Sequence, residues 1–585
     1  MRLTLFLSRA AVLAAALTLS SIACIQRGKP RGTRTDQTTP VRGGTLRLAT
    51  LSDLRMLDPA VAFDSETQPF LNFLFAGLVD YDQRGELVAD LAERWEISAD
   101  GKEYRFFLRH GVRMHDGNEL TADDVKRSAE RTLNPDTPFP ALAFLERLEG
   151  LADYQAKKSD HISGVVVESS HVVTYRLTGP DATFLPVLAL PFLRPVCRTA
   201  GMRYDENFSK QPCGAGPFKI GAWEPGRYLR VDRFDGYFVP GKPYLDAIEM
   251  RMDVPRLTQR FQIEKGELDF MYEFERPDWI YFRTHPEWSK YAFEVTSPSV
   301  YGEFMNVEME PFTDKRVRQA VAAAINRPNL QRYMESLAKV TGHVIPPGIP
   351  GYEEEVPYAQ TYDLARARAL MAEAGYPYDP ATGQGGYPEP IQYFAGEGDS
   401  AVRWAELLQY TLNQIGIHIE IKVVSFAQYL ALTGRPRTVK MGFAGWNIDF
   451  RDPSDFFEPV FGSQAIAEEE SQNHAFYRNP TLDALLSRAH VELDQSQRLA
   501  MYHEAEKIVC DDAPWALTYY PMRRELAQPW VRDYRPHPVW LLHFKDTWID
   551  ERGKDTHSAF FSLPRKGNGA LGALLPSLSL SSEAR

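Results

Sequence analysis

The segment 408–421 joins a helical pattern directly to a strand pattern, and this junction limits the classes of fold that the chain can adopt. Apolar residues first recur on one helical face and then alternate along a strand: Leu408, Leu412 and Ile415, then Ile417, Ile419 and Ile421. Gly416 stands between them, where the end of a helix favours a residue that tolerates a positive φ. Helical and strand patterns alternate along the whole chain, which predicts an α/β fold built in layers.

Three other segments carry specific local signals. Residues 43–49 alternate as an opening strand does, and residues 95–108 predict a hairpin around an Asp-Gly turn. Thr121, followed three residues later by Asp124, predicts the N-terminus of a helix. Apolar residues between 364 and 375 predict another helix that ends at a glycine.

Length and composition describe a large globular protein. At roughly 150 residues per domain, 585 residues predict about four domains or fewer, larger ones. Hydrophobic residues make up 44% and charged residues 25%, which excludes a disordered chain, a collagen and a coiled coil. The net charge of −12 provides no basic surface, so we expect no nucleic-acid partner.

The N-terminal 23 residues have the pattern of an export signal. Two arginines precede an apolar run at 10–19 that is too short to span a bilayer, and small residues follow. The four residues that end at Cys24, Ser-Ile-Ala-Cys, resemble a bacterial lipobox, although serine replaces the usual leucine. We therefore expect a signal peptide at 1–23, lipidation of Cys24, and a flexible tether at 24–40.

The alternative at this end is an ordinary cleaved signal peptide followed by an incidental cysteine. At the other end, residues 556–585 become rich in Gly, Ser and Leu, which predicts a loose tail. The apolar stretch 184–196 contains three prolines and an arginine, so we expect buried strands and turns there rather than a membrane span.

Three cysteines remain when Cys24 is assigned to the lipid. An odd number leaves one free thiol in an exported protein. Cys197 and Cys213 are the candidate disulfide because they are close in sequence, and the pairing of Cys510 stays open. Since C-x-x-C and H-E-x-x-H motifs are absent from the sequence, we expect no metal site.

Several short motifs could suggest an enzyme, and each has a simpler interpretation. Residues 214–217 begin like a dinucleotide loop, but a proline stands where the helix would start, which favours a structural turn. Residues 115–117, His-Asp-Gly, are typical of a turn. Asp449, Asp452 and Asp455 lack the spacing of a calcium loop. We expect no catalytic residues and no cofactor, although paired carboxylates of a glycoside hydrolase would meet only in the fold.

Five blocks along the chain resemble, in order, the family 5 extracellular solute-binding proteins, which are peptide, oligopeptide and nickel receptors of ABC transporters. The blocks lie at 91–125 (with Leu-Ala-Glu-Arg-Trp-Glu-Ile-Ser-Ala-Asp-Gly-Lys at 91–102), 214–246 (with Gly-Ala-Gly-Pro-Phe at 214–218 and Lys-Pro-Tyr-Leu-Asp at 242–246), 265–269 (Lys-Gly-Glu-Leu-Asp), 306–327 (with Val-Arg-Gln-Ala at 317–320) and 446–453 (with Trp-Asn-Ile-Asp at 446–449). The similarity extends from about residue 43 to residue 548.

This resemblance implies a periplasmic binding protein type II-like fold, in which two lobes enclose a ligand cleft and an extra domain is inserted in the first lobe. The implied boundaries are 41–78, 210–293 and 515–555 for the discontinuous lobe I, 79–209 for the inserted domain, and 294–514 for lobe II.

The resemblance also implies two ligand-binding residues. In peptide receptors of this family a carboxylate pairs with the free ammonium of the ligand, and alignment assigns that role to Asp449. Trp446, three residues earlier, would line the pocket wall. The alternative is that Asp449 is a solvated loop acid beside the Asp452-Pro453 turn.

The other end of the ligand matches the family less well. Dipeptide receptors place an arginine for the peptide carboxylate about fifty residues before the aspartate, and residues 394–399 contain no arginine here. Arg403 is close in sequence, but we expect it on the solvated face of a helix. A longer peptide, a ligand without a carboxylate, another cationic solute or a metal chelate therefore stays open.

The function that follows from the resemblance is the substrate-binding component of an ABC importer. We expect a non-enzymatic monomer that captures a peptide or other small cationic solute and delivers it to a permease with ATPase subunits. It would be a periplasmic or cell-envelope lipoprotein held to the membrane through Cys24. The alternatives are a secreted hydrolase acting on peptides or glycans, and a solute sensor of the same fold.

Overall fold

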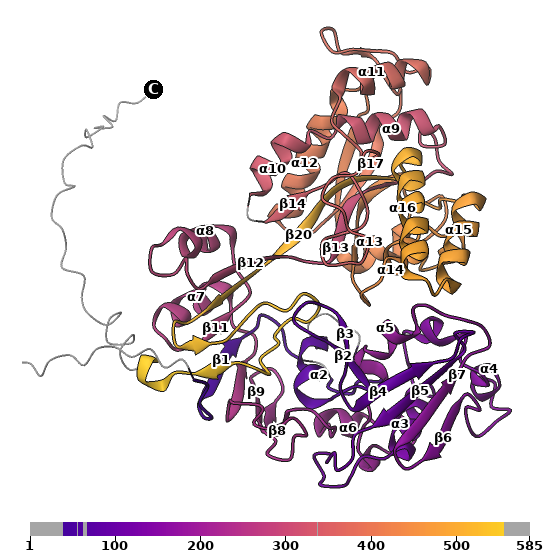
Figure 1. The fold of residues 1–585 in the computed structure, drawn as a ribbon. Coiled ribbons are helices and arrows are strands. Elements are labelled where there is room, and N and C mark those ends of the chain that lie inside the picture. The colour runs from indigo at the N-terminus through magenta and orange to yellow at the C-terminus, as the bar shows by residue number, and fades with distance from the viewer. Residues whose placement is uncertain (1–38, 55, 63–66, 336, 555–585) are drawn as a thin grey trace, which may run out of the picture. The chain divides into compact units, whose positions relative to one another are not determined.

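The computed structural model describes residues 39–54, 56–62, 67–335 and 337–554 (Figure 1). The expected signal peptide 1–23, the lipidation site Cys24, most of the tether 24–40 and the tail 556–585 lie outside the described residues. Among the described helices, none is long and apolar enough to cross a membrane.

The first sheet gathers strands from distant parts of the chain. Its order is β1-β10-β9-β8, with β1 and β10 parallel and the other neighbours antiparallel. Its strands are β1 (Thr45–Ala49), β8 (Phe218–Glu224), β9 (Tyr228–Arg233) and β10 (Ala247–Arg251). Leu46 and Leu48 of β1 share a buried core with Leu542 and Phe544, so this part of the structure is discontinuous in sequence. Strand β1 confirms the alternation at 43–49.

The second sheet is antiparallel and has its own core. Its order is β4-β5-β7-β6, with strands β4 (Ala92–Ile97), β5 (Glu103–Leu108), β6 (Val165–Ser169) and β7 (Val172–Arg176). The predicted hairpin joins β4 to β5, and Gly101 in its turn has a φ of +67°. Helix α3 (Ala122–Thr132) begins with the predicted capping box of Thr121 and Asp124.

The burial predicted for residues 184–196 is confirmed, but the prediction of strands was wrong. This segment forms helix α5 (Phe184–Leu188) and the 3₁₀ helix η2 (Pro191–Leu193) instead of strands. Proline is tolerated in the first turn of a helix because the N–H groups there have no partner within the helix. Pro191 begins η2, and Pro186 lies in the first turn of α5.

The third sheet has eight strands and carries helices on both faces. The path β11-β20-β13-β19-β17-β18 forms its body, and β12 and β14 also pair with β20. Its strands are β11 (Phe270–Met271), β12 (Ala292–Thr296), β13 (Ser299–Met305), β14 (Ala338–Val340), β17 (Ile391–Gly396), β18 (Ile419–Val424), β19 (Met441–Asn447) and β20 (Trp515–Ala527). Met305 and Met441 face one core, while Phe304 and Ala444 face the other.

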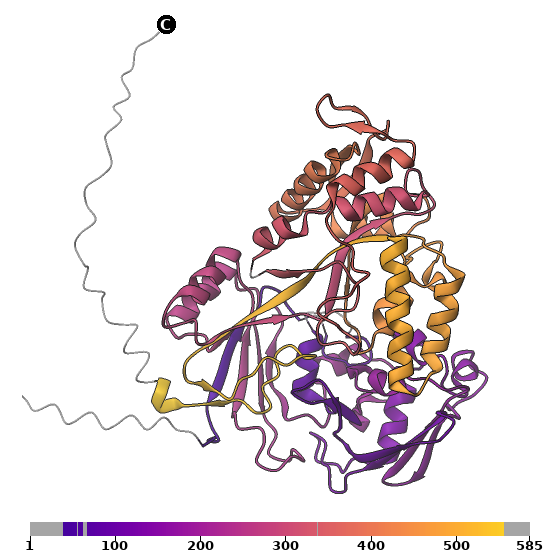
Figure 2. The ribbon, with the colours of Figure 1, turned by 45° about the horizontal axis from the view of Figure 1, so that its top comes forward.

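Helices α9 to α12 supply residues to the first of these cores, and α14 to α16 supply residues to the second. Figure 2 shows α15 and α16 side by side. The helices are α9 (Lys315–Ala324), α10 (Arg327–Met334), α11 (Leu364–Glu373), α12 (Asp399–Asn413), α13 (Phe426–Thr433), α14 (Ser454–Phe461), α15 (Pro480–Val491) and α16 (Gln495–Asp512). The predicted helix–glycine–strand unit is confirmed as α12, Gly416 with a φ of +76°, and β18.

The remaining elements are short, apart from two helices of nine residues beside the first sheet. They are α2 (Gln68–Leu74), β2 (Val79–Tyr81), β3 (Leu87–Ala89), η1 (Leu142–Leu145), α4 (Leu151–Gln155), η3 (Arg198–Ala200), α6 (Glu206–Lys210), α7 (Arg256–Glu264), α8 (Arg276–Thr284), β15 (Tyr378–Asp379), β16 (Gln384–Gly385), η4 (Ser463–Ala465), β21 (Val531–Arg532) and β22 (Trp548–Ile549).

Strand β20 changes partners along its length. Residues 515–519 pair with β13, and residues 522–526 pair with β12. Pro521 stands at the change, and it has no N–H to donate to a neighbouring strand. Strands β12 and β13 are themselves consecutive and are joined by two residues, Ser297 and Pro298. The segment β12–β13 and strand β20 therefore run side by side through this point of the sheet. Each has a proline there, Pro298 in the first and Pro521 in the second.

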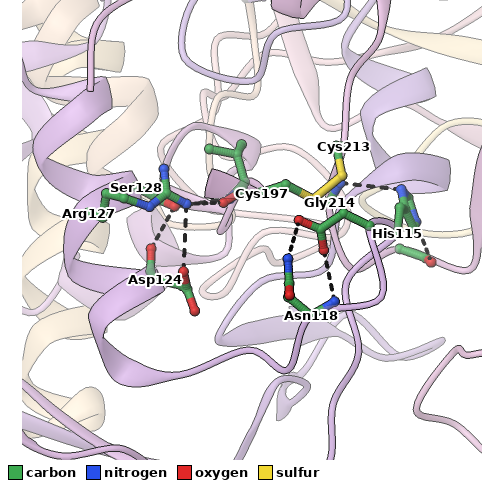
Figure 3. Close-up of a disulfide and its surroundings, with 11 residues drawn as sticks. His115, Asn118, Asp124, Arg127, Ser128, Cys197, Cys213 and Gly214 are labelled. Atoms are coloured by element: carbon green, nitrogen blue, oxygen red, sulfur yellow. Dashed lines mark hydrogen bonds and ion pairs between the residues drawn. A yellow bond between two sulfur atoms is a disulfide. The ribbon is translucent and has the colours of Figure 1, made fainter. Parts of the chain in front are cut away.

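A disulfide joins Cys197 to Cys213 (Figure 3), with the two sulfur atoms 2.01 Å apart. The backbone N–H of Cys197 also donates to the carbonyl of Cys213 at 2.9 Å. The bond links the chain that leaves η2 to the turn that leads into β8, and it restricts the unfolded chain. Cys510 is a buried free thiol.

Candidate functional site

The parallel strands of the eight-stranded sheet end at one edge. Strands β18 and β19 both run parallel to β17, so their carboxyl ends lie together. In open α/β sheets, ligands bind outside the carboxyl ends of the strands. Trp446 belongs to the end of β19, and Asp449 follows it by three residues, so the two predicted ligand-binding residues both lie at this edge.

Asp449 meets a second acid, Asp455, in the first turn of α14. The backbone N–H of Asp449 donates to a carboxylate oxygen of Asp455 at 2.8 Å. Asp455 is 2% exposed and Asp449 is half-buried. The structure therefore differs from the solvated loop acid that was the alternative for Asp449.

Burial raises the pKa of both carboxyl groups. Loss of hydration raises the pKa of Asp449 to about 7, because the charged form is disfavoured away from water. Burial also raises the pKa of Asp455, and repulsion from the charge of Asp449 adds to the effect, while the Trp446 indole opposes it. Neither carboxyl group has an ion pair with a basic residue in the described part of the chain.

Asp452, between the two, has a different environment. Its carboxylate accepts two hydrogen bonds from Arg498, at 2.5 and 2.6 Å, and another from the backbone N–H of Ser454. Its charge is compensated within the protein, and it fixes the turn before α14. Of three aspartates at similar spacing, the structure leaves only Asp449 and Asp455 with uncompensated carboxyl groups.

Trp446 is half-buried and packs against the core formed with α14 to α16. Residues alternate along a strand, so Trp446 lies on the face of β19 opposite to Phe443 and Asn447. Its position beside Asp455 places an apolar wall next to the two acids.

The other motifs singled out in the sequence have structural roles. The backbone N–H of Gly214 donates to Nδ1 of His115, and Nε2 of His115 lies 3.1 Å from the carbonyl of Gly216 (Figure 3). A carbonyl oxygen only accepts, so Nε2 carries the proton and the ring is neutral. Burial lowers the pKa of His115 to about 4.

The residues around the disulfide do not form a metal site. Asp116, Cys197 and Cys213 are the one group of at least three potential ligand atoms found close together among residues 39–54, 56–62, 67–335 and 337–554. The two sulfur atoms are bonded to each other and offer no thiolate. Arg403 lies on the exposed side of α12.

The sequence interpretation considered Asp455 only as part of a calcium loop, so it missed the partner of Asp449. It also missed Glu303, a fully buried acid on β13, because its hydrogen-bond partners, Tyr393 and Trp404, lie far from it in sequence. The spacing of six residues between Asp449 and Asp455, across a turn into a helix, is the one local signal for the pair.

Comparisons with known proteins agree on one family. Residues 86–468 match the model of the bacterial extracellular solute-binding proteins, family 5, middle. The chain is similar to the dipeptide-binding protein of Escherichia coli K12, with 28% identity over 85% of this chain and 92% of that protein. It is also similar to the glutathione-binding protein of Pectobacterium atrosepticum, with 28% identity over 80% of this chain and 87% of the relative.

Solved structures show the same fold. A periplasmic binding protein associated with an ABC transporter of Helicobacter pylori, in complex with the peptide STSA, superimposes with a TM-score of 0.69 and 26% identity. The superposition covers 87% of this chain and 98% of the other. The predicted α/β fold of the periplasmic binding protein type II is therefore confirmed.

The carboxyl pair predicts an unusual pH dependence of stability. An aspartate in an unfolded chain has a pKa of about 3.9, so between roughly pH 4 and pH 7 the folded protein holds a proton on Asp449 that the unfolded chain has lost. This group therefore stabilises the fold at low pH, and its contribution is lost as the pH rises through about 7. The asparagine side chain of Asp449→Asn cannot ionise, so this variant should not lose stability in this way as the pH rises.

Urea unfolding without ligand, at pH 5 and pH 8, measures the difference. We expect the free energy of unfolding of Asp449→Asn to rise relative to that of the parent protein between pH 5 and pH 8. The expected difference is up to a few kcal/mol. Glu406→Gln, an exposed acid on α12, serves as the control and should follow the parent. If the free energy of unfolding changed equally between pH 5 and pH 8 in Asp449→Asn and in the parent, the raised pKa of Asp449 would be contradicted.

Proposed function

Because the chain belongs to the family 5 bacterial extracellular solute-binding proteins, we propose that it captures a peptide or another small cationic solute for an ABC importer. The observation that carries this proposal is the pair Asp449 and Asp455, one half-buried and one buried carboxyl group without a basic partner among the described residues. Two similar proteins are named as a dipeptide-binding protein and a glutathione-binding protein, which supports a peptide-like solute.

The amine of the solute is the natural partner for Asp449. A buried carboxylate without a counter-ion is unfavourable by several kcal/mol, and an ammonium group within hydrogen-bond distance removes that cost. Binding would favour the carboxylate form of Asp449 over its protonated form. Trp446 would shield the ion pair from water, which strengthens the attraction.

We propose the division of the chain that the family implies. Lobe I would contain 41–78, 210–293 and 515–555, the inserted domain 79–209, and lobe II 294–514. The cores of the first sheet, of the antiparallel sheet and of the eight-stranded sheet support this division, except that residues 515–520 pack in the cores of the eight-stranded sheet. The paired passage of β12–β13 and β20, with a proline in each segment, supports a hinge at residues 297–298 and 521.

Contacts between segments of two proposed domains support closure around a solute. Ala182 of the proposed inserted domain donates its N–H to the carbonyl of His490 in proposed lobe II at 3.0 Å. The imidazole of His490 lies 3.3 Å from Asp181 and 3.1 Å from Glu458. Burial would lower the pKa of His490, but the two carboxylates outweigh it and raise the pKa to about 10. His490 is thus charged at neutral pH and holds the two segments together.

We propose that the solute is bound and released without chemical change. Members of this family are binding proteins, and the acids of the site have the arrangement of a cation receptor rather than a nucleophile with its base. Mass spectrometry of a solute recovered from the protein tests this: a hydrolysed product would favour the alternative of a secreted hydrolase.

The importance of Asp449 is tested by the change Asp449→Asn. The variant retains the shape of the side chain but cannot form an ion pair, so we expect the affinity for amine-bearing peptides to fall by well over tenfold. Isothermal titration calorimetry with unmodified and N-acetylated forms of one peptide measures the effect, and circular dichroism checks the fold.

The acetylated peptide provides an internal control. It should bind weakly to the parent protein, and Asp449→Asn should lose little further affinity for it. Glu406→Gln should bind both peptides as the parent does. Equal affinities of Asp449→Asn and the parent for the unmodified peptide would refute the assignment of Asp449.

We propose that Cys24 carries a lipid that holds the protein at the cell envelope, where it acts as a monomer next to a permease and its ATPase subunits. The proposal relies on the Ser-Ile-Ala-Cys pattern that ends the signal-like segment. Cys24→Ser should move the protein from the membrane fraction to the soluble fraction of the cells that express it. Cys510→Ser, which changes a buried thiol instead, should stay with the membrane. Retention of Cys24→Ser in the membrane would contradict the lipid anchor.

A further inference from the structure

Four aromatic side chains form a layer at the end of the eight-stranded sheet, on the face that α12 covers. We call them the aromatic layer; they are Tyr301, Trp404, Phe443 and Tyr519. The ring of Tyr301 stacks on Tyr519 with centroids 5.3 Å apart and an angle of 8°, and on Phe443 at 5.5 Å and 22°. Trp404 meets the layer edge-on, 5.6 Å from Tyr519.

A glycine makes this arrangement possible. Gly445 on β19 lies directly opposite Tyr301 on β13. A Cβ atom at Gly445 would lie 2.1 Å from the ring of Tyr301, which is too close for any side chain. The absence of a side chain lets the Tyr301 ring lie flat across the neighbouring strand, where it reaches Phe443. The four rings are half-buried, so part of the layer remains accessible.

The aromatic layer adjoins the site of Asp449. The hydroxyl of Tyr301 donates to Oδ1 of Asn447 at 3.0 Å, and Asn447 is the exposed last residue of β19, two residues before Asp449. Strand register places Tyr301 near the end of the sheet where β17 and β19 finish, whereas Met305 lies at the opposite end. The aromatic layer and Asp449 therefore belong to the same end of the sheet, with the layer on the face of β19 opposite to Trp446.

A buried acid lies beneath the layer. Glu303 is 0% exposed, and its carboxyl group accepts hydrogen bonds from Trp404 Nε1 at 2.7 Å and from the hydroxyl of Tyr393 at 2.8 Å. Both donors are neutral, and Glu303 has no basic partner in the part of the chain that the structure describes. Burial raises the pKa of Glu303 to about 8, so the group is close to taking up a negative charge if a cation arrives above it.

We propose that the aromatic layer binds a second positively charged group of the solute, an ammonium or guanidinium on a side chain. The proposal extends the proposed function, since it assumes that the first cation of the solute pairs with Asp449. Aromatic faces attract cations with an energy of about 0.5 to 2 kcal/mol. An uncharged apolar side chain would also pack on the rings, but it would gain nothing from Glu303.

Glu303 has the role of a positioning residue. Its carboxyl group fixes the indole of Trp404 through the Nε1 hydrogen bond and holds the layer in place from below. A carboxylate in this position also polarises the indole that donates to it, which strengthens the attraction of the ring for a cation. Two uncompensated acidic sites near one sheet edge, Asp449 with Asp455 and Glu303, are complementary in charge to a solute with two cationic groups.

Calorimetry on the full-length protein with Ala-Lys-Ala and with the tripeptide that carries norleucine in place of lysine tests the proposal. The two peptides have nearly the same shape and differ in one charge. We expect the lysine peptide to bind between about twofold and thirtyfold more tightly, the range that corresponds to one cation–aromatic contact. Equal affinities, or tighter binding of the norleucine peptide, would overturn the proposal.

The variants Trp404→Leu and Glu303→Gln locate the effect. Trp404→Leu should bring the affinity ratio of the two peptides close to one, and Trp404→Phe, which retains an aromatic face, should keep part of it. Glu303→Gln retains the shape of the side chain, and its one amide oxygen can still accept from Trp404 Nε1, so it tests the charge even if Trp404→Leu does not fold. Glu406→Gln on the same helix should leave the ratio as it is in the parent. If Trp404→Leu and Glu303→Gln both kept the affinity ratio of the parent protein for the two peptides, the second cation would bind elsewhere.

A separate pair of ligands distinguishes this proposal from the proposed function. If neither tripeptide binds, the assignment of a peptide as solute fails. The same calorimetric comparison is then made with 1,5-diaminopentane and n-pentylamine. Tighter binding of the diamine would support a second cation site on a solute that is not a peptide. Equal or absent binding of the two amines would overturn the aromatic layer as a cation site.

Discussion

The hydrogen bonding of β20 is the constraint on which the rest of the structure depends. This one strand pairs with β13 and β14 in its first part and with β12 and β11 in its second part, so it belongs to two neighbouring regions at once. Pro521 offers no N–H donor at the point where β20 changes its partner from β13 to β12. The proposed hinge lies at this change of partner, where β14 still pairs with residues 519–521 and the N–H of Ser297 donates to the carbonyl of Pro521.

The acids at the edge of the eight-stranded sheet show a different constraint. Burying a carboxyl group without a cation destabilises a fold, and proteins usually compensate it, as Arg498 does for Asp452. Asp449, Asp455 and Glu303 lack this compensation in the described residues, and burial raises the pKa of each of the three carboxyl groups. The proposed pairing of Asp449 with a solute cation, and the proposed support of the aromatic layer by Glu303, would account for the retention of these groups.

Local patterns allowed much of the fold to be predicted. The unit of α12, Gly416 and β18 depends on neighbours in sequence, and so do the hairpin around Gly101 and the capping box of α3. The strands expected in the segment 184–196 were wrong because two of its three prolines, Pro186 and Pro191, occupy first turns of helices, which sequence pattern alone does not distinguish from breaks. Asp449 was found through a resemblance, whereas its partner Asp455 and the surroundings of Glu303 depend on contacts between distant segments. Whether a buried acid has a counter-ion cannot be read from its own neighbours in sequence.

If Asp449 pairs with the amine of a solute, its protonated carboxyl group must give up the proton. Calorimetric binding at pH 6, repeated in two buffers of different ionisation enthalpy, counts the protons released. With a pKa of about 7 in the free protein, Asp449 should release about one proton when an amine-bearing peptide binds. The release should disappear in Asp449→Asn. A binding enthalpy that is the same in both buffers for the parent protein would contradict the account.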